Sequence, residues 1–456
     1  MRRTLAAALV AIMLLVACGP EDAPAARAVV SPATSTTGTV PAPTDIDSTA
    51  TTAAPPTDPA DIGEPVPSTT CVGRTSALDV GDEAAPPVLL DRFDFVLASP
   101  LWRDVERSVS VWIDGYGEVL ADDADLQLLP ASNQKIFTAF GAALELPADH
   151  RFVTTVHRSG SDLVVVAGGD PTLRRVGPHS LAALAQQVAE TGVDAVDSIV
   201  IDASHFEPTR TAPGWLDYQM PAYVGPMSAL MVDDNRYRTD TTFVADPDMA
   251  NGELFAYLLA GVGVDINGPV VVETREVDDE VARVASAPVA ELVEVMMTNS
   301  DNEVAEALLR EIGGGSTTGG VAVVDERLDE WCLDLQGESG DGSGLGRASL
   351  RSAREWRRML QVALDQTWAN AFRDGLAVAG RTGTLKERFV GSPAEGIVWA
   401  KTGSIFGGRS LSGYTTTADG REVVFSVVIN GGTDDARVAR EAIDGLVNAI
   451  VSPLPA

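Results

Sequence analysis

Lysine is almost missing from this chain of 456 residues, in which Lys135, Lys386 and Lys401 are the only lysines among 33 basic residues. Positive charge is scarce altogether, because 65 Asp and Glu residues leave a formal net charge of −32. A surface of that sign repels a phosphate backbone, which argues against a nucleic-acid partner. Three cysteines are too few for a disulfide-rich scaffold or a cysteine-based zinc site. What remains is an ordinary globular composition in a chain long enough for two to three domains.

The N-terminus has the features of an export signal. Arg2 and Arg3 precede an apolar run over residues 5–17, which ends in small residues and is shorter than the ~20 residues that span a bilayer. Cys18 directly follows Leu-Val-Ala and resembles the acylated cysteine of a bacterial lipobox; the alternative is an ordinary secretory signal. Residues 1–17 therefore predict a signal peptide. We expect an extracytoplasmic protein that touches the membrane only through a lipid anchor on Cys18, or is otherwise secreted.

The segment after the signal has almost no large apolar side chains. Residues 18–85 are dominated by Pro, Ala, Thr, Ser and Asp, so they bury too little surface to offset the entropy of ordering and predict a disordered tether. Cys71 and Cys332 form an even pair in an exported protein, where a disulfide between them is favoured. Two unpaired thiols are the alternative, because the sequence does not measure their separation.

The rest of the chain alternates between helical and strand periodicity. Helical patterns cover residues 89–105, 137–146, 181–191, 254–262, 289–312 (interrupted at 298–302), 321–335, 350–366 and 436–450. Strand patterns cover residues 109–113 with a turn at 116–117, then 153–156, 163–167, 198–201, 270–272, 397–402, 411–416 and 423–429. This order predicts an α/β sandwich, in which helices flank an antiparallel sheet with strands from both ends of the chain. A smaller α+β domain is inserted over residues 151–284.

The few lysines are candidates for acid–base chemistry, because an ammonium can be pushed into titrating range and a guanidinium cannot. Ser132 lies three residues before Lys135, a spacing that places both on one helix face, with the serine at the positive end of the helix. The lysine can then take the proton of the hydroxyl. Because chance alone produces this spacing often, the pair needs support from elsewhere in the chain.

Two further motifs supply that support. Lys401-Thr402-Gly403 ends a predicted strand, where the glycine leaves room for a ligand backbone along the strand. Ser300-Asp301-Asn302 interrupts a helix and can bring a hydroxyl and an amide together in a loop, although Ser300 can equally be a helix cap. Each motif alone is compatible with a structural role. All three in this order, in an exported protein, are hard to ascribe to chance.

The three motifs together resemble those of the penicillin-recognising serine enzymes, which include wall-modifying D,D-peptidases and β-lactamases. Longer strings narrow the resemblance to the D-alanyl-D-alanine carboxypeptidase/endopeptidase family of low-molecular-mass penicillin-binding proteins, namely residues 296–306, 341–347, 381–389, 400–404 and 411–414. The similarity runs from about residue 86 to the C-terminus. It implies a transpeptidase/β-lactamase-like catalytic domain over residues 86–150 and 285–456, interrupted by an accessory domain over 151–284.

Two positions and one length depart from the family pattern. Gly346 stands where the family usually has serine, and Ser404 where it often has threonine. The insert is shorter than in fuller members, so the second of their two accessory domains is reduced or missing.

The resemblance implies cleavage of the terminal D-Ala-D-Ala bond of peptidoglycan stem peptides through an acyl-enzyme, with β-lactams acylating the same serine. It requires no metal or organic cofactor. By motif, the site residues are Ser132 as nucleophile, Lys135 as base, Ser300 as proton relay, Asn302 on the substrate amide, Lys401 as a positive charge, and Thr402, Gly403 and Ser404 along the substrate carboxylate. The backbone N–H groups of Ser132 and Ser404 would form the oxyanion hole.

Substrate selection is predicted in the insert. Trp215, Asp217 and Tyr223 lie in a stretch that resembles a part of the family at the edge of the active site, where a carboxylate beside aromatic rings suits a diamino acid. A turn with core aromatics is the alternative. Arg347 is either a further ligand or a structural ion-pair partner. The four histidines are expected to be structural or solvated, because they fall in or beside the insert and no G-x-S-x-G elbow accompanies them.

Two other functions compete with a serine D,D-carboxypeptidase that also acts as an endopeptidase. A β-lactamase would need a separate glutamate motif for its deacylating water, which we do not find. A non-catalytic peptidoglycan-binding lipoprotein would have no reason to retain Ser132, Lys135, Ser300, Asn302 and Lys401 together.

Overall fold

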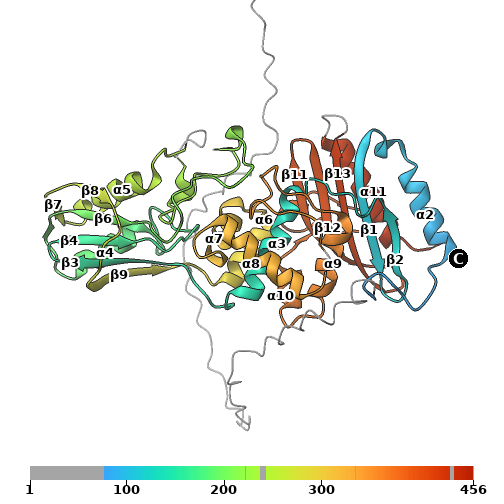
Figure 1. Ribbon diagram of the computed structural model, residues 1–456, viewed down its shortest axis with the longest axis horizontal. Coiled ribbons are helices and arrows are strands. Elements are labelled where there is room, and N and C mark those ends of the chain that lie inside the picture. Colours follow the sequence, from blue (N-terminus) through green and yellow to red (C-terminus); the bar gives the residue numbers. More distant parts are fainter. Residues whose placement is uncertain (1–76, 221, 237–242, 334, 432–435, 455–456) are drawn as a thin grey trace, which may run out of the picture. The chain divides into compact units, whose positions relative to one another are not determined.

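The computed structural model describes residues 77–220, 222–236, 243–333, 335–431 and 436–454 (Figure 1). They fall within one compact unit that spans residues 61–456. Among these described residues, no helix combines the length and the apolar character needed to cross a membrane.

One sheet has six strands, and both ends of the chain contribute to it (Figure 1). Its order is β10-β11-β12-β13-β1-β2, and every pair is antiparallel. The N-terminal strand β1 lies beside the C-terminal β13, with Val105 opposite Gly431. The predicted antiparallel sheet built from both chain ends is confirmed. The strands are β1 Val105–Ile113, β2 Gly117–Asp122, β10 Ala377–Val378, β11 Trp399–Ile405, β12 Gly408–Thr416 and β13 Glu422–Gly431.

Helices cover both faces of this sheet, because its central strands are apolar on both sides. In β13, Phe425 and Val427 join a core with α2 and α11, whereas Val424 and Val428 join the core of the other helices. The first face carries α2 Pro87–Leu97 and α11 Ala436–Val451. Packed on or behind the second face are α3 Gln134–Glu145, α6 Val289–Asn299, α7 Asn302–Ile312, α8 Thr317–Glu330, α9 Ala353–Ala363 and α10 Ala369–Asp374.

A second sheet of mixed direction is built from residues between α3 and α6. Its order is β8-β6-β4-β3-β9, with β4, β6 and β8 parallel to one another and β3 antiparallel to both of its neighbours. The elements are β3 Val153–Ser159, β4 Asp162–Val166, α4 Leu181–Glu190, β6 Ile199–Asp202, α5 Pro247–Gly261, β8 Val270–Val272 and β9 Asp279–Ala285, with a small parallel pair of β5 Ala195–Val196 and β7 Asp265–Ile266. We call residues 151–284 the insert. Its boundaries as a domain stay a prediction.

Several elements differ from the sequence prediction, and three of them are informative about local structure or the site. Helix α8 begins at Thr317, inside the expected glycine-rich loop, because Ser316 caps it by accepting from the N–H of Gly319. Strand β9 was not predicted, because charged residues interrupt its alternation. Strand β11 continues to Ile405, so Lys401 lies inside the strand rather than at its end.

The predicted tether is anchored at its C-terminal end. Asp79 forms ion pairs with Arg357 and Arg358, and Val80 bridges to Gly117. The tether that the sequence predicts over residues 18–85 is therefore attached to the catalytic body by residue 79. Cys332 is disulfide-bonded. Cys71, which the sequence suggests as its partner, and Cys18 lie outside the described residues.

Candidate active site

Ser132 lies in a tight turn that the sheet holds in place. A 3-10 turn over Ala131–Asn133 leads into α3, and Ala131 has a positive φ of 50°. The Oγ of Ser410 on β12 donates to the carbonyl of Pro130 at 2.7 Å, and Asn133 donates to the Oγ of Ser412 at 2.5 Å. Strained backbone of this kind persists only where its surroundings over-determine it. The turn therefore presents the half-buried Ser132 from a rigid base.

Lys135, one turn further along α3, is fully buried and meets three oxygen atoms. Its Nζ lies 3.2 Å from Ser132 Oγ, 2.7 Å from Asn302 Oδ1 and 2.7 Å from the carbonyl oxygen of Ser343. The structure thus brings Ser132 and Lys135 of the predicted S-x-x-K motif together with Asn302, the last residue of the S-D-N motif. The third contact, to Ser343, was not predicted.

Burial lowers the pKa of Lys135 from 10.5 to about 8, although the nearby carboxylates of Asp341, Asp301, Glu303 and Glu306 act in the opposite direction. A neutral amine has two N–H groups and one lone pair. The two acceptors at 2.7 Å, Asn302 Oδ1 and the Ser343 carbonyl, use both N–H groups. The lone pair then faces the hydroxyl of Ser132. This set of contacts suits a base that removes the hydroxyl proton.

The S-D-N motif forms the junction between α6 and α7. Ser300 ends α6 in a left-handed conformation with φ of 63°, and Asp301 caps α7 by accepting from the N–H of Val304 at 2.9 Å. That geometry points Asn302 at Lys135. The hydroxyl of Ser300 is half-buried and makes no hydrogen bond among the described residues, so it remains available to another group.

Lys401 supplies a second buried cation on β11. Its side chain is fully buried, and burial together with the charge of Lys135 lowers its pKa well below the ordinary value. Its Nζ donates to the carbonyl of Thr402 at 3.0 Å, and it has no carboxylate partner among the residues that the structure describes. Because Lys135 affects its pKa and the Ser132 turn packs on β11, the two lysines share one site.

Gly403 has a different role from the one predicted. A Cβ at this position would lie 2.0 Å from Ser410 Oγ and 2.7 Å from the carbonyl of Pro130. The space that the glycine leaves is therefore filled by the turn that carries Ser132, and not by a ligand backbone. Thr402 and Ser404 point to the opposite, more open side, where Thr402 donates to the hydroxyl of Thr384 at 2.7 Å.

Asp341 is a site residue to which the sequence assigned no role. Its fully buried carboxylate accepts from the Ser343 hydroxyl at 2.7 Å and from the N–H groups of Gly344, Leu345 and Gly346, each at 3.1 Å. These bonds curl residues 341–346 into a loop that turns the Ser343 carbonyl toward Lys135. The signal in the sequence was an aspartate followed by Gly-Ser-Gly, a pattern in which a carboxylate caps its own turn.

The insert residues predicted at the site edge divide into two groups. Trp215 and Tyr223 reach the site: the Nε1 of Trp215 donates to Asp341 at 2.9 Å, and the backbone carbonyl of Tyr223 accepts from Asn302 at 2.8 Å. Asp217 is exposed and makes no side-chain contact among the described residues. Arg347 donates to the carbonyl of Phe406 at 2.6 Å, in the turn between β11 and β12.

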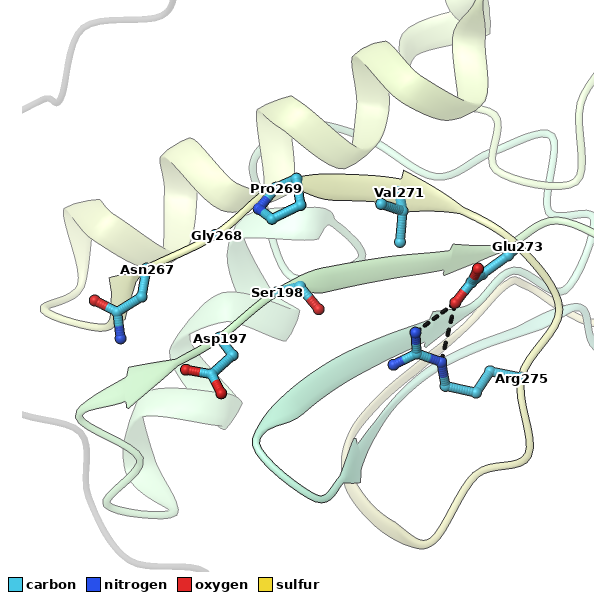
Figure 2. A pocket seen from close by; sticks show the side chains of 8 residues that line it. All are labelled: Asp197, Ser198, Asn267, Gly268, Pro269, Val271, Glu273 and Arg275. Atoms are coloured by element: carbon cyan, nitrogen blue, oxygen red, sulfur yellow. Dashed lines mark hydrogen bonds and ion pairs between the residues drawn. The ribbon is translucent and has the colours of Figure 1, made fainter.

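The histidines have partners that are not candidate catalytic residues. His150 and His205 flank Glu311, His179 pairs with Asp170, and His157 contacts the hydroxyl of Thr155. A hollow of about 500 Å³ among the described residues contains none of the candidate residues (Figure 2). It lies at the edge of the insert sheet and is lined by an ion pair of Glu273 and Arg275 together with small and polar side chains.

Comparison with solved structures establishes the fold. Penicillin binding protein 4 from Haemophilus influenzae superposes with a TM-score of 0.69 at 21% sequence identity, over 79% of this chain and 97% of that chain. The transpeptidase/β-lactamase-like fold predicted from the motifs is confirmed.

Comparison with known sequences establishes the family. The sequence matches the D-Ala-D-Ala carboxypeptidase 3 (S13) family over residues 109–245 and 238–450. It is 30% identical to a D-alanyl-D-alanine carboxypeptidase of Actinomadura sp., over 81% of this chain and 86% of that protein. It is also 31% identical to a carboxypeptidase of Mycobacterium tuberculosis, over 70% of this chain and 75% of that protein. With its serine, its buried lysines and these similarities, the chain belongs to the D-Ala-D-Ala carboxypeptidase 3 (S13) family of serine-type carboxypeptidases.

Proposed function

We propose that this serine-type carboxypeptidase cleaves the terminal D-Ala-D-Ala bond of peptidoglycan stem peptides with Ser132 as its nucleophile and Lys135 as its base. The arrangement of three oxygens around the Nζ of Lys135 carries the proposal, because it leaves the lone pair of the neutral amine for the Ser132 proton. In the first step, Ser132 Oγ bonds to the carbonyl carbon between the two D-alanines as Lys135 takes the hydroxyl proton.

The second step expels the terminal D-alanine. The proton passes from Lys135 through the free hydroxyl of Ser300 to the departing amine, and the C–N bond breaks to leave an acyl-enzyme on Ser132. Water then hydrolyses this ester and regenerates the hydroxyl. The junction between α6 and α7 suits this relay, because it holds Ser300 two residues from the Asn302 that contacts Lys135.

The edge of β11 would hold the substrate. Strand β10 pairs only with Trp399 and Ala400, so the residues from Lys401 onward have no strand neighbour on that side among the described residues. A peptide can add to such an edge through main-chain hydrogen bonds. We assign Asn302 to its backbone amide, the Thr402 and Ser404 hydroxyls to its terminal carboxylate, Lys401 to the compensating charge, and the N–H groups of Ser132 and Ser404 to the oxyanion.

The same geometry supports acylation by β-lactams, which present a reactive carbonyl and a carboxylate in place of D-Ala-D-Ala. Labelling the protein with benzylpenicillin and locating the adduct by mass spectrometry tests the assignment. The adduct should lie on Ser132, and Ser132→Ala should abolish both labelling and D-alanine release. An adduct on another residue, or full D-alanine release by the variant, would overturn it. Rapid release of the penicilloyl group would instead favour a β-lactamase.

Endopeptidase action on cross-links and a preference for a diamino acid are part of the same proposal. Asp217 is exposed and lies two residues after Trp215, whose indole reaches Asp341, so its carboxylate would be the group that meets a terminal ammonium. Asp217→Asn should then reduce D-alanine release from a lysine-containing peptide but not from its norleucine analogue. Equal kinetics on both peptides would remove Asp217 from the substrate site.

We also propose that the protein is lipid-anchored outside the cytoplasmic membrane through Cys18. The basic start, the short apolar run and the Leu-Val-Ala sequence before Cys18 support this. Detergent-phase partition of the wild type, and its loss in Cys18→Ser, is the expected result. A wild-type protein found only in the aqueous phase would favour secretion.

A further inference from the structure

Besides the hydroxyl of Ser132, two oxygen atoms orient Lys135. Both of them depend on one short segment of the insert. One is the carbonyl of Ser343, in the loop held by Asp341, and the other is the side chain of Asn302. The described residues 215–220 and 222–223, which we call the clamp segment, contact the loop and the asparagine at separate points.

The first contact is made by Trp215. Its indole N–H donates to Asp341 Oδ2 at 2.9 Å, and that same oxygen accepts from the Ser343 hydroxyl and from the N–H of Gly346. The carboxylate is fully buried, so a lost donor would not be replaced by bulk water. Trp215 therefore helps to fix the carboxylate around which the Ser343 carbonyl is turned.

The second contact is made by Gln219, which is 1% exposed. Its Nε2 donates to the carbonyl of Leu345 at 2.8 Å, and its Oε1 accepts from the N–H of Leu216 within the clamp segment. One amide thus joins the clamp segment to the Asp341 loop. The sequence did not single out this residue, because a lone glutamine carries no pattern.

The third contact is made by the backbone of Tyr223. Its carbonyl accepts from Asn302 Nδ2 at 2.8 Å, which fixes the amide so that its oxygen faces Lys135. Two residues later, the N–H of Gly225 donates to Glu303 at 3.0 Å, and Arg236 of the insert pairs with the same carboxylate. The start of α7 is therefore held from the insert side.

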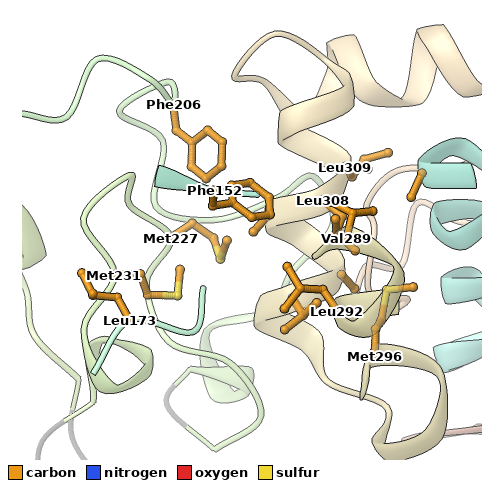
Figure 3. Packing of buried hydrophobic residues seen from close by; sticks show 14 of the residues in the cluster. Phe152, Leu173, Phe206, Met227, Met231, Val289, Leu292, Met296, Leu308 and Leu309 are labelled. Carbon is orange, nitrogen blue, oxygen red and sulfur yellow. The ribbon is translucent and has the colours of Figure 1, made fainter. Parts of the chain in front are cut away.

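Apolar packing makes this arrangement stiff. Trp215 and Met220 of the clamp segment pack against a buried cluster that contains Met227 of the insert, Leu292 of α6 and Leu308 of α7 (Figure 3). Close-packed interiors resist small displacements, so this packing restrains the clamp segment against the helices behind the site.

From these contacts we infer that Trp215 and Gln219 are positioning residues for the general base Lys135, acting through the Asp341 loop, and not contacts for the substrate side chain. The inference rests on the proposed function, in which Lys135 is the base. It gives the insert a part in acylation that is independent of which peptide or β-lactam is bound.

The test is Trp215→Phe, which keeps an aromatic ring and removes the donor. We would measure Ser132 acylation by benzylpenicillin, and D-alanine release from two D-Ala-D-Ala peptides that carry lysine or norleucine at the diamino-acid position. The acylation rate and both kcat values should fall together, on the order of tenfold, while KM changes little. Tyr218→Phe is the matched control, because Tyr218 is an exposed aromatic of the same segment, and it should leave all three unchanged.

A loss confined to the lysine peptide, or a rise in KM alone, would make Trp215 a substrate contact and overturn the inference. Gln219→Met provides a second, independent variant if Trp215→Phe does not fold, and it should give the same uniform loss. In the double variant Trp215→Phe/Asp341→Asn, the acylation rate should fall by less than the product of the two single-variant fold losses, because both changes act on one hydrogen bond. Additive costs would count against it. Wild-type labelling at a residue other than Ser132 would instead refute the proposed function itself.

Discussion

The insert and the candidate active site of the six-stranded body differ in how buried charged groups are paired. In the insert, buried carboxylates have local partners: Asp170 pairs with His179 at 2.6 Å, and Asp248 pairs with Arg210 at 2.6 Å. At the candidate active site, Lys401 is equally buried, donates to a backbone carbonyl and has no carboxylate partner among the described residues. Burying an unpaired charged group costs folding free energy, and such groups are found mainly where they have a function.

The comparison separates charged groups that have a structural partner from charged groups that can take part in chemistry. The hollow of about 500 Å³ lies in the insert and contains an ion pair, whereas the two buried lysines lie in the body, beside Ser132. A counter-ion that binds beside Lys401 would favour its charged form, which burial and Lys135 disfavour by lowering its pKa. For Lys401 we expect that counter-ion to be the carboxylate of the substrate.

The largest effect should come from Lys135→Arg. A guanidinium remains protonated and cannot accept the hydroxyl proton, so kcat/KM should fall by about 10³-fold or more. Lys386→Arg is the matched control, since Lys386 is an exposed lysine, and its activity should equal that of the wild type. D-Alanine release and penicillin labelling measure both. Appreciable activity in Lys135→Arg would show that another group is the base.

The next largest effect should come from Lys401→Met, which removes the unpaired charge and keeps the length of the side chain. We expect a loss of kcat/KM on the order of 10²-fold on a peptide with a free terminal carboxylate. On the matching peptide amide, wild type and variant should differ much less, because that substrate brings no counter-ion. Equal losses on the acid and the amide would contradict a role in carboxylate binding.

A pH profile should locate the base. Burial lowers the pKa of Lys135 to about 8, and the neutral form is the active one, so kcat/KM should rise with pH and level off above about 8. Because the Asp341 carboxylate favours the ammonium, Asp341→Asn should move this limb to lower pH. Steady-state rates between pH 5.5 and 9.5 measure it. A flat profile between pH 6 and 8 would show that Lys135 is not the titrating base.

A paired buried charge should matter for stability. Arg310 of α7 is fully buried, donates to the carbonyls of Thr209 and Thr211 of the insert, and lies beside Glu306. Arg310→Met leaves that carboxylate without its cation, which should cost about 3 kcal/mol or more of unfolding free energy. Adding Glu306→Gln should recover part of the loss. Denaturant unfolding of both variants measures this, and an unchanged midpoint for Arg310→Met would contradict it.

The smallest effect should come from an exposed pair of the insert. Arg283 and Glu280, three residues apart on the edge strand β9, form an ion pair whose attraction is screened by solvent. Arg283→Gln should leave Tm and activity unchanged within error. A clear drop in Tm would mean that exposed charge contributes more to the insert than burial suggests.

Much of the fold was readable in the chain because local patterns and long-range partners agreed. The alternation in β1 and β13 predicted strands, and polar residues at 298–302 marked the break between α6 and α7. The S-x-x-K spacing placed Ser132 beside Lys135, because three residues make one turn of a helix. Strand β9 was not predicted, because an exposed edge strand keeps charged residues that break the apolar alternation.

The site was only partly readable, since several of its members act through backbone atoms or at long sequence separation. The carbonyls of Ser343 and Tyr223 carry no side-chain signature, yet they orient Lys135 and Asn302. Gly403 was read as room for a ligand, because the residue type reports that space is needed and does not report what fills it. The packing of the Ser132 turn against β11 and β12 supplied that answer.

The sequence alone determined which groups can react: a serine and a lysine one helical turn apart, and a second lysine on a strand. The chain has just one other lysine, so these two were easy to identify as candidates. These features follow from spacing and from the chemistry of an amine, and both can be read in one dimension. Only the tertiary structure decided that Lys135 is buried away from solvent, and that a carbonyl of residue 343 and an amide oxygen of residue 302 accept from its two N–H groups. It also decided that a segment of the insert contacts both of these acceptor residues or their loop. Those outcomes depend on burial and on contacts between residues far apart in the chain, which no local pattern encodes.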